Sequence, residues 1–313
     1  MLRYAILRVF SAIPTLVLVG VTVFALMRLV PGDPAALLIG DIQNLDRLEE
    51  VRAELGLDKP VPVQFLMWAG DILRGDFGTS IMTDQPVLPV ILERLSVTFQ
   101  VVALAVVLSA LIAVPAGMVA AWRQNSAIDG AIVTTSVAAM SIPSFWIGLM
   151  LILLFGIELG WLPSVGYVSL AEDFGRGIRY LIMPVTALVL AEIGTILRMA
   201  RASTIEVMRR DYITHARAKG LSEGAVLARH AFPNAFAPTL TVIGLIFGAL
   251  LGGAAVIETV FTLPGLGRLL IDAISARDYP VVQGVMLVVA VLYVLINLLT
   301  DLLYPVFDPR VQL

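Results

Sequence analysis

The sequence contains no cysteine and has few charged residues. Without cysteine, disulfides, thiolate metal ligands and cysteine nucleophiles are excluded. Only 14% of the chain is charged and 59% is hydrophobic, whereas roughly a quarter of residues are charged in soluble proteins. The patterns HExxH, GxSxG and GxxxxGK(S/T), which mark metalloproteases, serine hydrolases and phosphate-binding loops, are also missing. The sequence therefore indicates a membrane protein without an ATP site of its own.

The chain has instead several long uncharged runs. A bilayer core about 30 Å thick needs ~20 apolar residues per helix. Five runs reach that length: Val9–Met27, Leu95–Trp122, Gly130–Ile157, His230–Ile257 and Tyr279–Thr300. The first run is either a signal peptide or a span, and its length favours the span. Pro233 and Pro238 place the start of the fifth crossing near Asn234 to Pro238, since proline is tolerated best in the first turn of a helix.

One further run, Tyr180–Leu197, is interrupted by Glu192 and has Pro184 near its start. If it spans the membrane, the segment Arg198–Arg229 lies in the cytoplasm with seven Arg/Lys and three Asp/Glu. If it does not, this basic segment lies outside, against the positive-inside rule. We therefore expect an all-α integral membrane protein with six transmembrane helices and both termini cytoplasmic.

The segment Pro31–Arg94 then lies outside the membrane and is acidic, with eleven Asp/Glu and five Arg/Lys. Helical spacing predicts one helix over Leu45–Leu55, stopped by Gly56, and a second amphipathic helix over Val63–Leu73. This insertion is either a solvated cap or a docking surface for a soluble partner. The expected division is an N-terminal span (1–30), the insertion (31–94), a five-span core (95–305) that includes a cytoplasmic loop (198–233), and a tail (306–313).

The basic loop carries signals for short helices. The sequence Ser203–Glu206 has the form of a capping box, although a straight extension of the preceding span fits equally well. We expect Asp211 to cap a helix over Tyr212–Lys219, Gly220 to end it, and Ser222 to cap the next helix. The charge of the loop by itself is explained by membrane topology.

The spacing within this loop resembles a signature of the permease subunits of binding-protein-dependent ATP-binding cassette importers. That signature is EAA, three residues, Gly, nine residues, then I-x-L-P. Thr214–Ala216, Gly220 and His230–Pro233 stand at this spacing, with other residues in place of the first two letters and of the Ile and Leu. Tyr212 and the run Ala216–Gly220 look like the version in the peptide-type branch.

Other segments carry the same resemblance along almost the whole chain. They are Leu29–Pro34, Gly75–Ser80, Ser141–Trp146, Glu158–Pro163, Val260–Arg268 and Arg277–Pro280. Together they are similar to the first permease subunit of dipeptide, oligopeptide, glutathione or nickel importers. The fold that this implies is the type I importer permease fold, with an extracytoplasmic insertion after the first span.

The resemblance also implies partners and a location. A second related permease, two ATPase subunits and an extracytoplasmic substrate-binding protein would assemble with the chain in the lipid of the bacterial inner membrane. ATP and magnesium would be bound by the ATPases, and no metal, catalytic residue or nucleic acid is implied for this chain. In such importers the short loop helix docks on an ATPase. The residues expected to form that contact are Asp211, Tyr212, Thr214, His215, Ala216, Arg217, Ala218, Lys219 and Gly220.

Within the spans, a few residues are candidates for a substrate path. Glu192 either faces the path or packs against a neighbour. The glycines near Gly248 and Gly252 either allow close helix packing or form a narrow gate. Ser141 belongs to the same candidate set, and Pro143 either kinks its span or is merely tolerated there. Other function classes stay open: an ion-coupled transporter that uses Glu192 as its proton site, or a membrane-embedded enzyme, for which no constellation is visible.

Overall fold

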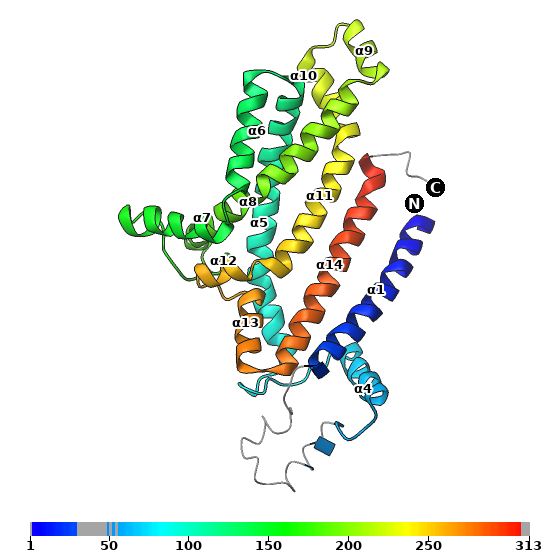
Figure 1. The fold of residues 1–313 in the computed structure, drawn as a ribbon, viewed down its shortest axis with the longest axis vertical. Helices are drawn as coiled ribbons and strands as arrows, with labels where there is room; N and C mark the ends of the chain where they lie inside the picture. The colour runs from blue at the N-terminus through cyan, green and yellow to red at the C-terminus, as the bar shows by residue number, and fades with distance from the viewer. Residues whose placement is uncertain (1, 30–48, 50–51, 54–55, 308–313) are drawn as a thin grey trace.

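The computed structural model describes residues 2–29, 49, 52–53 and 56–307, and the elements of these residues are helical apart from one isolated bridge between Thr79 and Pro86. Figure 1 shows an elongated bundle of long helices with short helices at both ends. In chain order the elements are α1 (Leu2–Leu29), α4 (Val61–Leu73), α5 (Val87–Trp122), α6 (Ala127–Met140), α7 (Ser144–Leu151), the π-helix η1 (Ile152–Glu158), α8 (Phe174–Met208), α9 (Asp211–Ala218), α10 (Glu223–Val226), the π-helix η2 (Leu227–Ala231), α11 (Phe232–Gly253), α12 (Ala255–Val260), α13 (Leu266–Ala276) and α14 (Tyr279–Phe307).

Five of the described helical segments are long and apolar enough to cross a membrane, and a sixth is made of two helices joined at a bend. This agrees with the six predicted crossings. The doubtful run Tyr180–Leu197 lies inside α8, which continues without a break to Met208. The straight extension of this span is therefore correct, and Ser203 is a buried residue within the helix rather than a cap.

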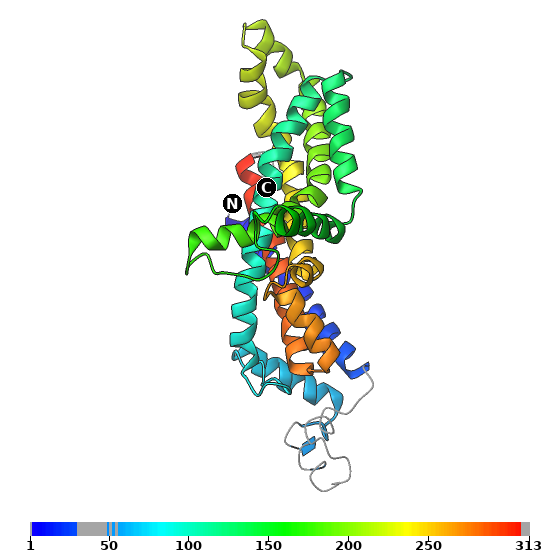
Figure 2. The same cartoon turned by 90° about the vertical axis from the view of Figure 1, so that its left-hand side faces the viewer.

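The third predicted span is not one helix with a kink. α6 and the pair α7–η1 meet at an angle of 90°. Proline disfavours the helical conformation of the residue before it and has no N–H to donate. Pro143 therefore ends the first helix and stands at the start of the second, where its carbonyl accepts hydrogen bonds from Trp146 and Ile147 at 3.0 and 3.1 Å. The α7–η1 arm projects sideways from the bundle (Figures 1 and 2).

The start of α11 also differs from the expectation. The helical segment runs from Glu223 to Gly253, so Pro238 lies inside a helix and not at its start. The ring of Pro233 would collide with the carbonyl four residues earlier in a regular α-helix. The wider π-helical turn η2, which comes directly before α11, accommodates this proline.

The long helices approach each other closely where one of them carries glycine. A β-carbon on Gly117 of α5 would lie 2.6 Å from the carbonyl oxygen of Leu197 on α8, and one on Gly194 of α8 would lie 2.8 Å from that of Ser136 on α6. Gly244 and Gly248 of α11 allow the same approach to α14. Small residues at these points let helix backbones pack within van der Waals contact in a bilayer.

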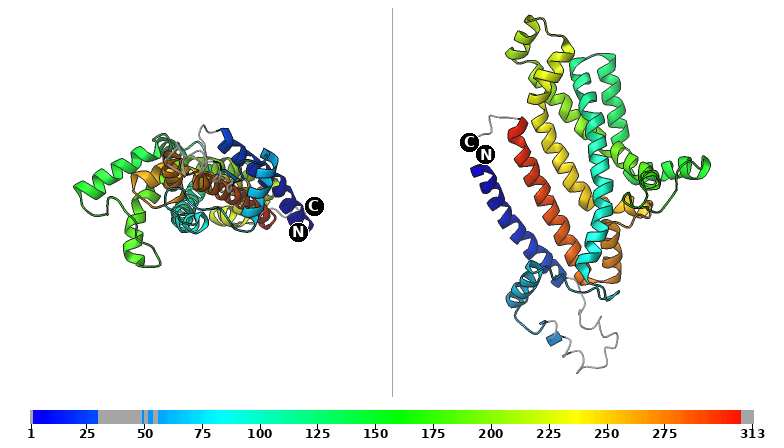
Figure 3. Two further views of the ribbon diagram at one scale, coloured as in Figure 1. Left: turned by 90° about the horizontal axis from the view of Figure 1, so that it is seen from below. Right: turned by 180° about the vertical axis from the view of Figure 1, so that it is seen from behind.

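The first and last spans lie side by side and antiparallel, as the views in Figures 1 and 3 show. Arg8 near the start of α1 forms an ion pair of 3.1 Å with Asp301 near the end of α14. Both of these ends point toward the end of the molecule that carries α9 (Figure 1). By the positive-inside rule this is the cytoplasmic end, and we refer to the opposite one as the outer end.

At the outer end, α4 begins at Val61, two residues before the predicted helix. Its Phe65 and Trp68 rings pack 5.5 and 5.7 Å from the ring of Phe24 on α1. Gly56 has a left-handed φ of 63°, as a helix stop signal requires. Most of the other predicted helix, Leu45–Leu55, lies outside the described residues.

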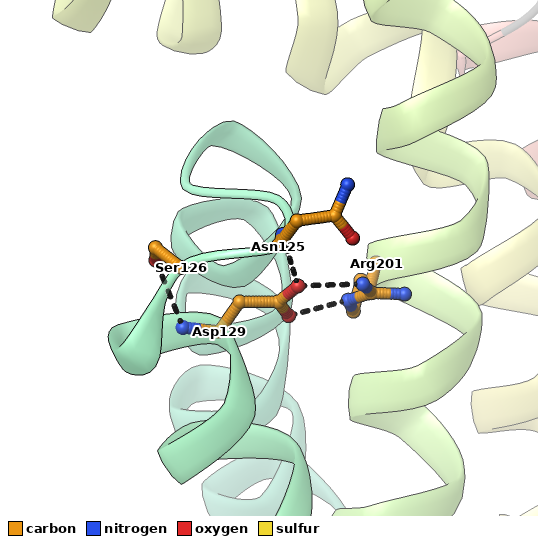
Figure 4. A network of polar contacts seen from close by, with 4 residues as sticks. All are labelled: Asn125, Ser126, Asp129 and Arg201. Carbon is orange, nitrogen blue, oxygen red and sulfur yellow. Dashed lines mark hydrogen bonds and ion pairs between the residues drawn. The ribbon is translucent and has the colours of Figure 1, made fainter.

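A charged network ties α6 to α8 near the cytoplasmic end. Asp129 accepts two hydrogen bonds of 2.7 Å from the guanidinium of Arg201 and one of 2.9 Å from the backbone N–H of Asn125 (Figure 4). The side chain of Asp129 is 7% exposed and that of Arg201 is 26% exposed. The side chain of Ser126 caps α6 by accepting from the N–H of Asp129. The turn before α6 is thereby fixed against α8.

We expect Asp129→Asn to destabilise the protein, because the substitution leaves the Arg201 guanidinium without its anionic partner. The free energy of unfolding should fall by about 2 kcal/mol, which lies between the values for breaking exposed and fully buried ion pairs. Thermal unfolding of the detergent-solubilised protein measures it. Glu206→Gln is the matched control, since it removes an exposed partner of Arg210 and should change stability by less than ~1 kcal/mol. Equal effects of the two substitutions would contradict the structural role of the Asp129 network.

Candidate functional site

The site suggested by the sequence is the helical loop that joins α8 to α11. α9 begins at Asp211, after Arg210 with an extended backbone. The prediction that Asp211 caps this helix is wrong: Asp211 is its first residue, and no side chain makes a capping hydrogen bond. The carboxylate still lies in the first turn, where the helix dipole favours negative charge.

The predicted corner after this helix is confirmed. Gly220 has a φ of +79°, and its N–H donates to the carbonyl of Arg217 at 2.9 Å. Residues that carry a side chain rarely adopt this left-handed backbone conformation, whereas glycine adopts it freely. The side chain of Ser222 caps α10 by accepting from the N–H of Ala225. Arg217 and Glu223 form an ion pair of 2.8 Å across the corner, so α9 and α10 are held at a fixed angle.

One face of α9 is buried against the rest of the loop. Ile213 and Ala216 are 0% and 6% exposed, and they form a small apolar cluster with Val226. Val207 and Met208 at the end of α8 pack against the same cluster. The loop is therefore a packed extension of α8, and α9 stands at the tip of the molecule (Figures 1 and 2).

The structure divides the predicted contact residues between two environments. Ala216 lies on the buried face of α9, and Arg217 is engaged by Glu223. Arg217 is nevertheless exposed, as are the other predicted residues: Asp211, Tyr212, Thr214, His215, Ala218, Lys219 and Gly220. The sequence did not distinguish the residues that support the helix from those that it presents to solvent.

A groove of about 680 Å³ lies beside α9 and extends down between the long helices. Its charged residues are of both signs, and Arg210 and Glu206 form an ion pair of 2.6 Å at its wall. The lining residues come from four helices and the turn between α8 and α9, and they are Ser203, Glu206, Val207, Arg210, Asp211, Tyr212, His215, Asn234, Ala237, Pro238 and Tyr304. Tyr212 and His215 thus border a cavity as well as facing solvent.

Two family models match the chain. Residues 113–313 match the binding-protein-dependent transport system inner membrane component, and residues 1–102 match the N-terminal region of such membrane components. The chain belongs to this family. It is an inner membrane transport component, a permease subunit, and the ATPase of such a system resides in separate subunits. Systems of this family work with a binding protein.

The relatives of this permease align along their whole length. A putative peptide transport system permease protein of Brucella abortus (strain 2308) is 46% identical over 305 residues, which is 97% of both chains. The glutathione transport system permease protein of Pectobacterium atrosepticum is 41% identical over 312 residues, covering 100% of this chain and 99% of the other. The dipeptide transport system permease protein of Alkalihalophilus pseudofirmus is 39% identical over 332 residues, covering both chains completely.

The residues predicted for a substrate path are spread over the permease. Ser141 and Pro143 form the bend between α6 and α7. Gly248 and Gly252 face α14, where added β-carbons would lie 2.5 Å from the ring of Tyr293 and 3.4 Å from Val289. Glu192 is partly buried on α8, and no hydrogen bond or ion pair of its carboxylate is found within the described part of the chain.

Among the described residues, the most deeply buried acid is one that the sequence reasoning missed. Glu258 of α12 is 0% exposed and accepts a hydrogen bond of 2.5 Å from the hydroxyl of Thr98 on α5. Its carboxylate also accepts from the N–H groups of Gly267 and Arg268 at the start of α13. The Thr98 hydroxyl in turn accepts from the N–H of Leu266 at 2.8 Å. One carboxylate thus joins α12 and α13 to α5.

The glycines beside this carboxylate leave no room for a side chain. A β-carbon on Gly265 would lie 2.2 Å from Glu258, and one on Gly267 would lie 2.5 Å from the backbone of Ala255. These residues belong to the segment Val260–Arg268, which the sequence marked only through its resemblance to a family pattern. The signal that was available is Glu258 itself, one residue beyond an uncharged run.

A second buried acid ties the outer loop to α14. Asp278, 3% exposed, accepts hydrogen bonds from the hydroxyl of Ser80 at 2.5 Å and from the N–H of Ile81 at 3.2 Å. Two segments of the family resemblance, Gly75–Ser80 and Arg277–Pro280, are therefore in contact. This contact fixes the outer loop on the first turn of the last span.

We expect Gly267→Ala to destabilise the permease, because the added methyl group meets backbone atoms that cannot rotate away. The cost of such overpacking is typically about 1–3 kcal/mol. Thermal unfolding in detergent is the measurement. Gly253→Ala makes the same chemical change where no atom lies within 4 Å, and alanine is the better helix former there. If both variants unfold at the wild-type temperature, the close contact of α13 with α12 is not important for stability.

Proposed function

We propose that this permease is the translocation subunit of an ATP-driven importer for dipeptides, oligopeptides or related small solutes. The observation that carries the proposal is its full-length similarity to permeases named for peptides, dipeptides and glutathione. A second related permease and two ATPases would complete the complex, and an extracytoplasmic binding protein would deliver the solute. ATP and magnesium would bind to the ATPases.

We further propose that the exposed face of α9 is the surface that docks on an ATPase. Tyr212, His215 and Lys219 stand on this face at intervals of three and four residues, which places them on one side of a helix. Ala218 and Gly220 add little bulk, so a partner surface can approach the end of the helix. His215, Lys219 and the helix corner provide polar groups at the rim.

The way α9 is attached supports a role in transmitting motion. Ile213, Ala216 and Val226 bind it to the end of α8 through a buried cluster, and the Arg217–Glu223 pair fixes the corner. α8 is a continuous helix of 35 residues. A displacement of α9 by a closing ATPase pair would therefore move α8 as one body, and with it α6, which is joined to α8 by Asp129 and Arg201.

Ala218→Trp tests the docking surface. The side chain is exposed, so a bulky residue can be accommodated in the isolated permease but blocks a closely packed contact. We expect the ATPase activity of the reconstituted importer and its transport rate to fall about tenfold or more, the effect of disturbing an interface hot spot. The unfolding temperature of the permease should stay unchanged.

Ala127→Trp is the matched control, because Ala127 is an exposed alanine at the same end of the molecule on α6. It should leave ATPase activity and transport near wild-type values. Gly220 is a poorer choice for this experiment, since a side chain at its positive φ costs about 1–2 kcal/mol and would mix a folding defect with a docking defect. Normal transport by Ala218→Trp would contradict the docking proposal.

The competing function is an ion-coupled transporter with Glu192 as its proton site. ATP-driven import predicts that uptake into proteoliposomes stops when ATP is omitted and continues when an uncoupler collapses the proton gradient. Glu192→Gln should show the same two responses. If uptake by the wild-type protein requires the proton gradient, and uptake by Glu192→Gln does not depend on it, the ion-coupled mechanism is established instead.

A further inference from the structure

A small charged pocket lies in the outer half of the permease, between the first turns of α5 and the first two turns of α13. Figure 1 shows α13 running from α12 toward the outer end of the molecule. The volume of the pocket is about 210 Å³. The lining residues are Arg94 from α5, Pro264 and Gly265 from the turn before α13, and Arg268, Leu269 and Asp272 from α13. Two guanidinium groups and one carboxylate therefore share this one small cavity.

The guanidinium groups of the pocket have unused hydrogen-bonding capacity. The Nε–H of Arg94 is buried and has no hydrogen-bond partner among the described residues. Arg268 has a long contact of 3.9 Å with Asp272, whose side chain is 70% exposed. A buried, unpaired cationic donor is unfavourable, and an anion that accepts from it would relieve the penalty.

Two backbone N–H groups at the start of α13, next to the pocket, already donate hydrogen bonds elsewhere. The N–H of Leu266 donates to Thr98, and that of Arg268 donates to Glu258 at 2.9 Å. The positive character of the pocket therefore comes from Arg94 and Arg268. The Glu258 network sets their separation, because it fixes α13, which carries Arg268, against α5, which carries Arg94.

We propose that this pocket binds the carboxylate of the transported solute, on the outer side and before its translocation. Guanidinium groups bind carboxylates through paired hydrogen bonds of matched geometry. Asp272 makes the pocket mixed in charge, which suits a small solute with both a carboxylate and an ammonium group better than a uniformly acidic protein surface. Peptides carry both groups at neutral pH. The inference rests on the proposed function, since it takes the solute to be of the peptide class.

The test uses the complete importer in proteoliposomes, with its binding protein loaded from a mixed library of dipeptides and tripeptides. Import of each peptide is followed by mass spectrometry at saturating binding protein. We expect Arg94→Gln to lower the import rate about tenfold, the value of one lost hydrogen bond to a charged group. The loss should be uniform across peptides of different side chains, because they share only their termini. Arg268→Gln should act similarly, and the double variant should lose less than the product of the two effects, since both residues would hold one group.

Further measurements separate this role from others. In Arg94→Gln the concentration of loaded binding protein that gives half-maximal ATPase activity should stay at the wild-type value. The unfolding temperature should not fall, because the substitution removes a buried donor that has no partner among the described residues. Arg94→Lys should recover part of the import rate. Arg74→Gln removes an arginine at the outer end whose side chain is 80% exposed and should import like wild type.

Two results would overturn the proposal. If Arg94→Gln raises the half-maximal concentration of binding protein while the maximal import rate is kept, the pocket receives an acidic side chain of the binding protein and not the solute. If import is unchanged in Arg94→Gln and Arg268→Gln, the pocket has no role in transport. If the wild-type importer takes up no peptide of the library, the assignment of its solute to short peptides fails, which is a different result from a defect limited to the variants.

Discussion

The buried carboxylate of Glu258 holds the outer half of the permease together. Around it, the short helix α12, the start of α13 and the turn of α5 at Thr98 converge, and its carboxylate accepts hydrogen bonds from one hydroxyl and two backbone N–H groups. A buried carboxyl group of this kind is tolerated because both of its oxygens accept hydrogen bonds. The position of α13, the shape of the Arg94–Arg268 pocket and the lack of side chains at Gly265 and Gly267 all depend on it.

The cytoplasmic half depends on a different kind of connection. There, the helices α6 and α8 are joined by the Asp129–Arg201 pair, and the loop helix α9 is joined to α8 by an apolar cluster. Both connections are made to α8, which begins at Phe174, after the α7–η1 arm, and ends at Met208, shortly before α9. The cytoplasmic tip is thus linked to the bundle on one side through α8 and on the other through the helical segment Glu223–Gly253, which continues into α11.

The sequence was sufficient for those features that depend on local rules. Hydrophobic length and the distribution of Arg and Lys predicted the crossings and their orientation, and the need for a left-handed residue predicted the corner at Gly220. The sequence could not show how far Pro143 would bend its span, because a proline is compatible with a mild kink as well as with a break of 90°. The position of Asp211 inside α9 rather than before it is a difference of one residue at a helix end, where local propensity is least decisive.

Other features of the candidate site depend on contacts between distant segments. Whether Ala216 faces a partner or the protein is decided by the neighbouring Val207, Met208 and Val226, and not by its own identity. The role of Glu258 likewise depends on contacts with other segments. Its partner Thr98 on α5 is 160 residues away along the chain, and its partner Arg268 on α13 is 10 residues away. The pairing of Arg94 with Arg268 is of the same kind, since nothing in either local sequence refers to the other.

The break at Pro143 has a consequence for the lipid around the protein. α6 has 14 residues and is thus about 21 Å long, shorter than a hydrocarbon core of ~30 Å. The α7–η1 arm that follows turns by 90° and exposes large apolar side chains, among them Trp146, Leu153 and Ile157. This flank of the permease therefore presents a short helix and a bent apolar arm to the acyl chains, whereas the flank of α1 and α14 presents full-length helices. Lipid beside the arm has to shorten, tilt or give way to a protein neighbour.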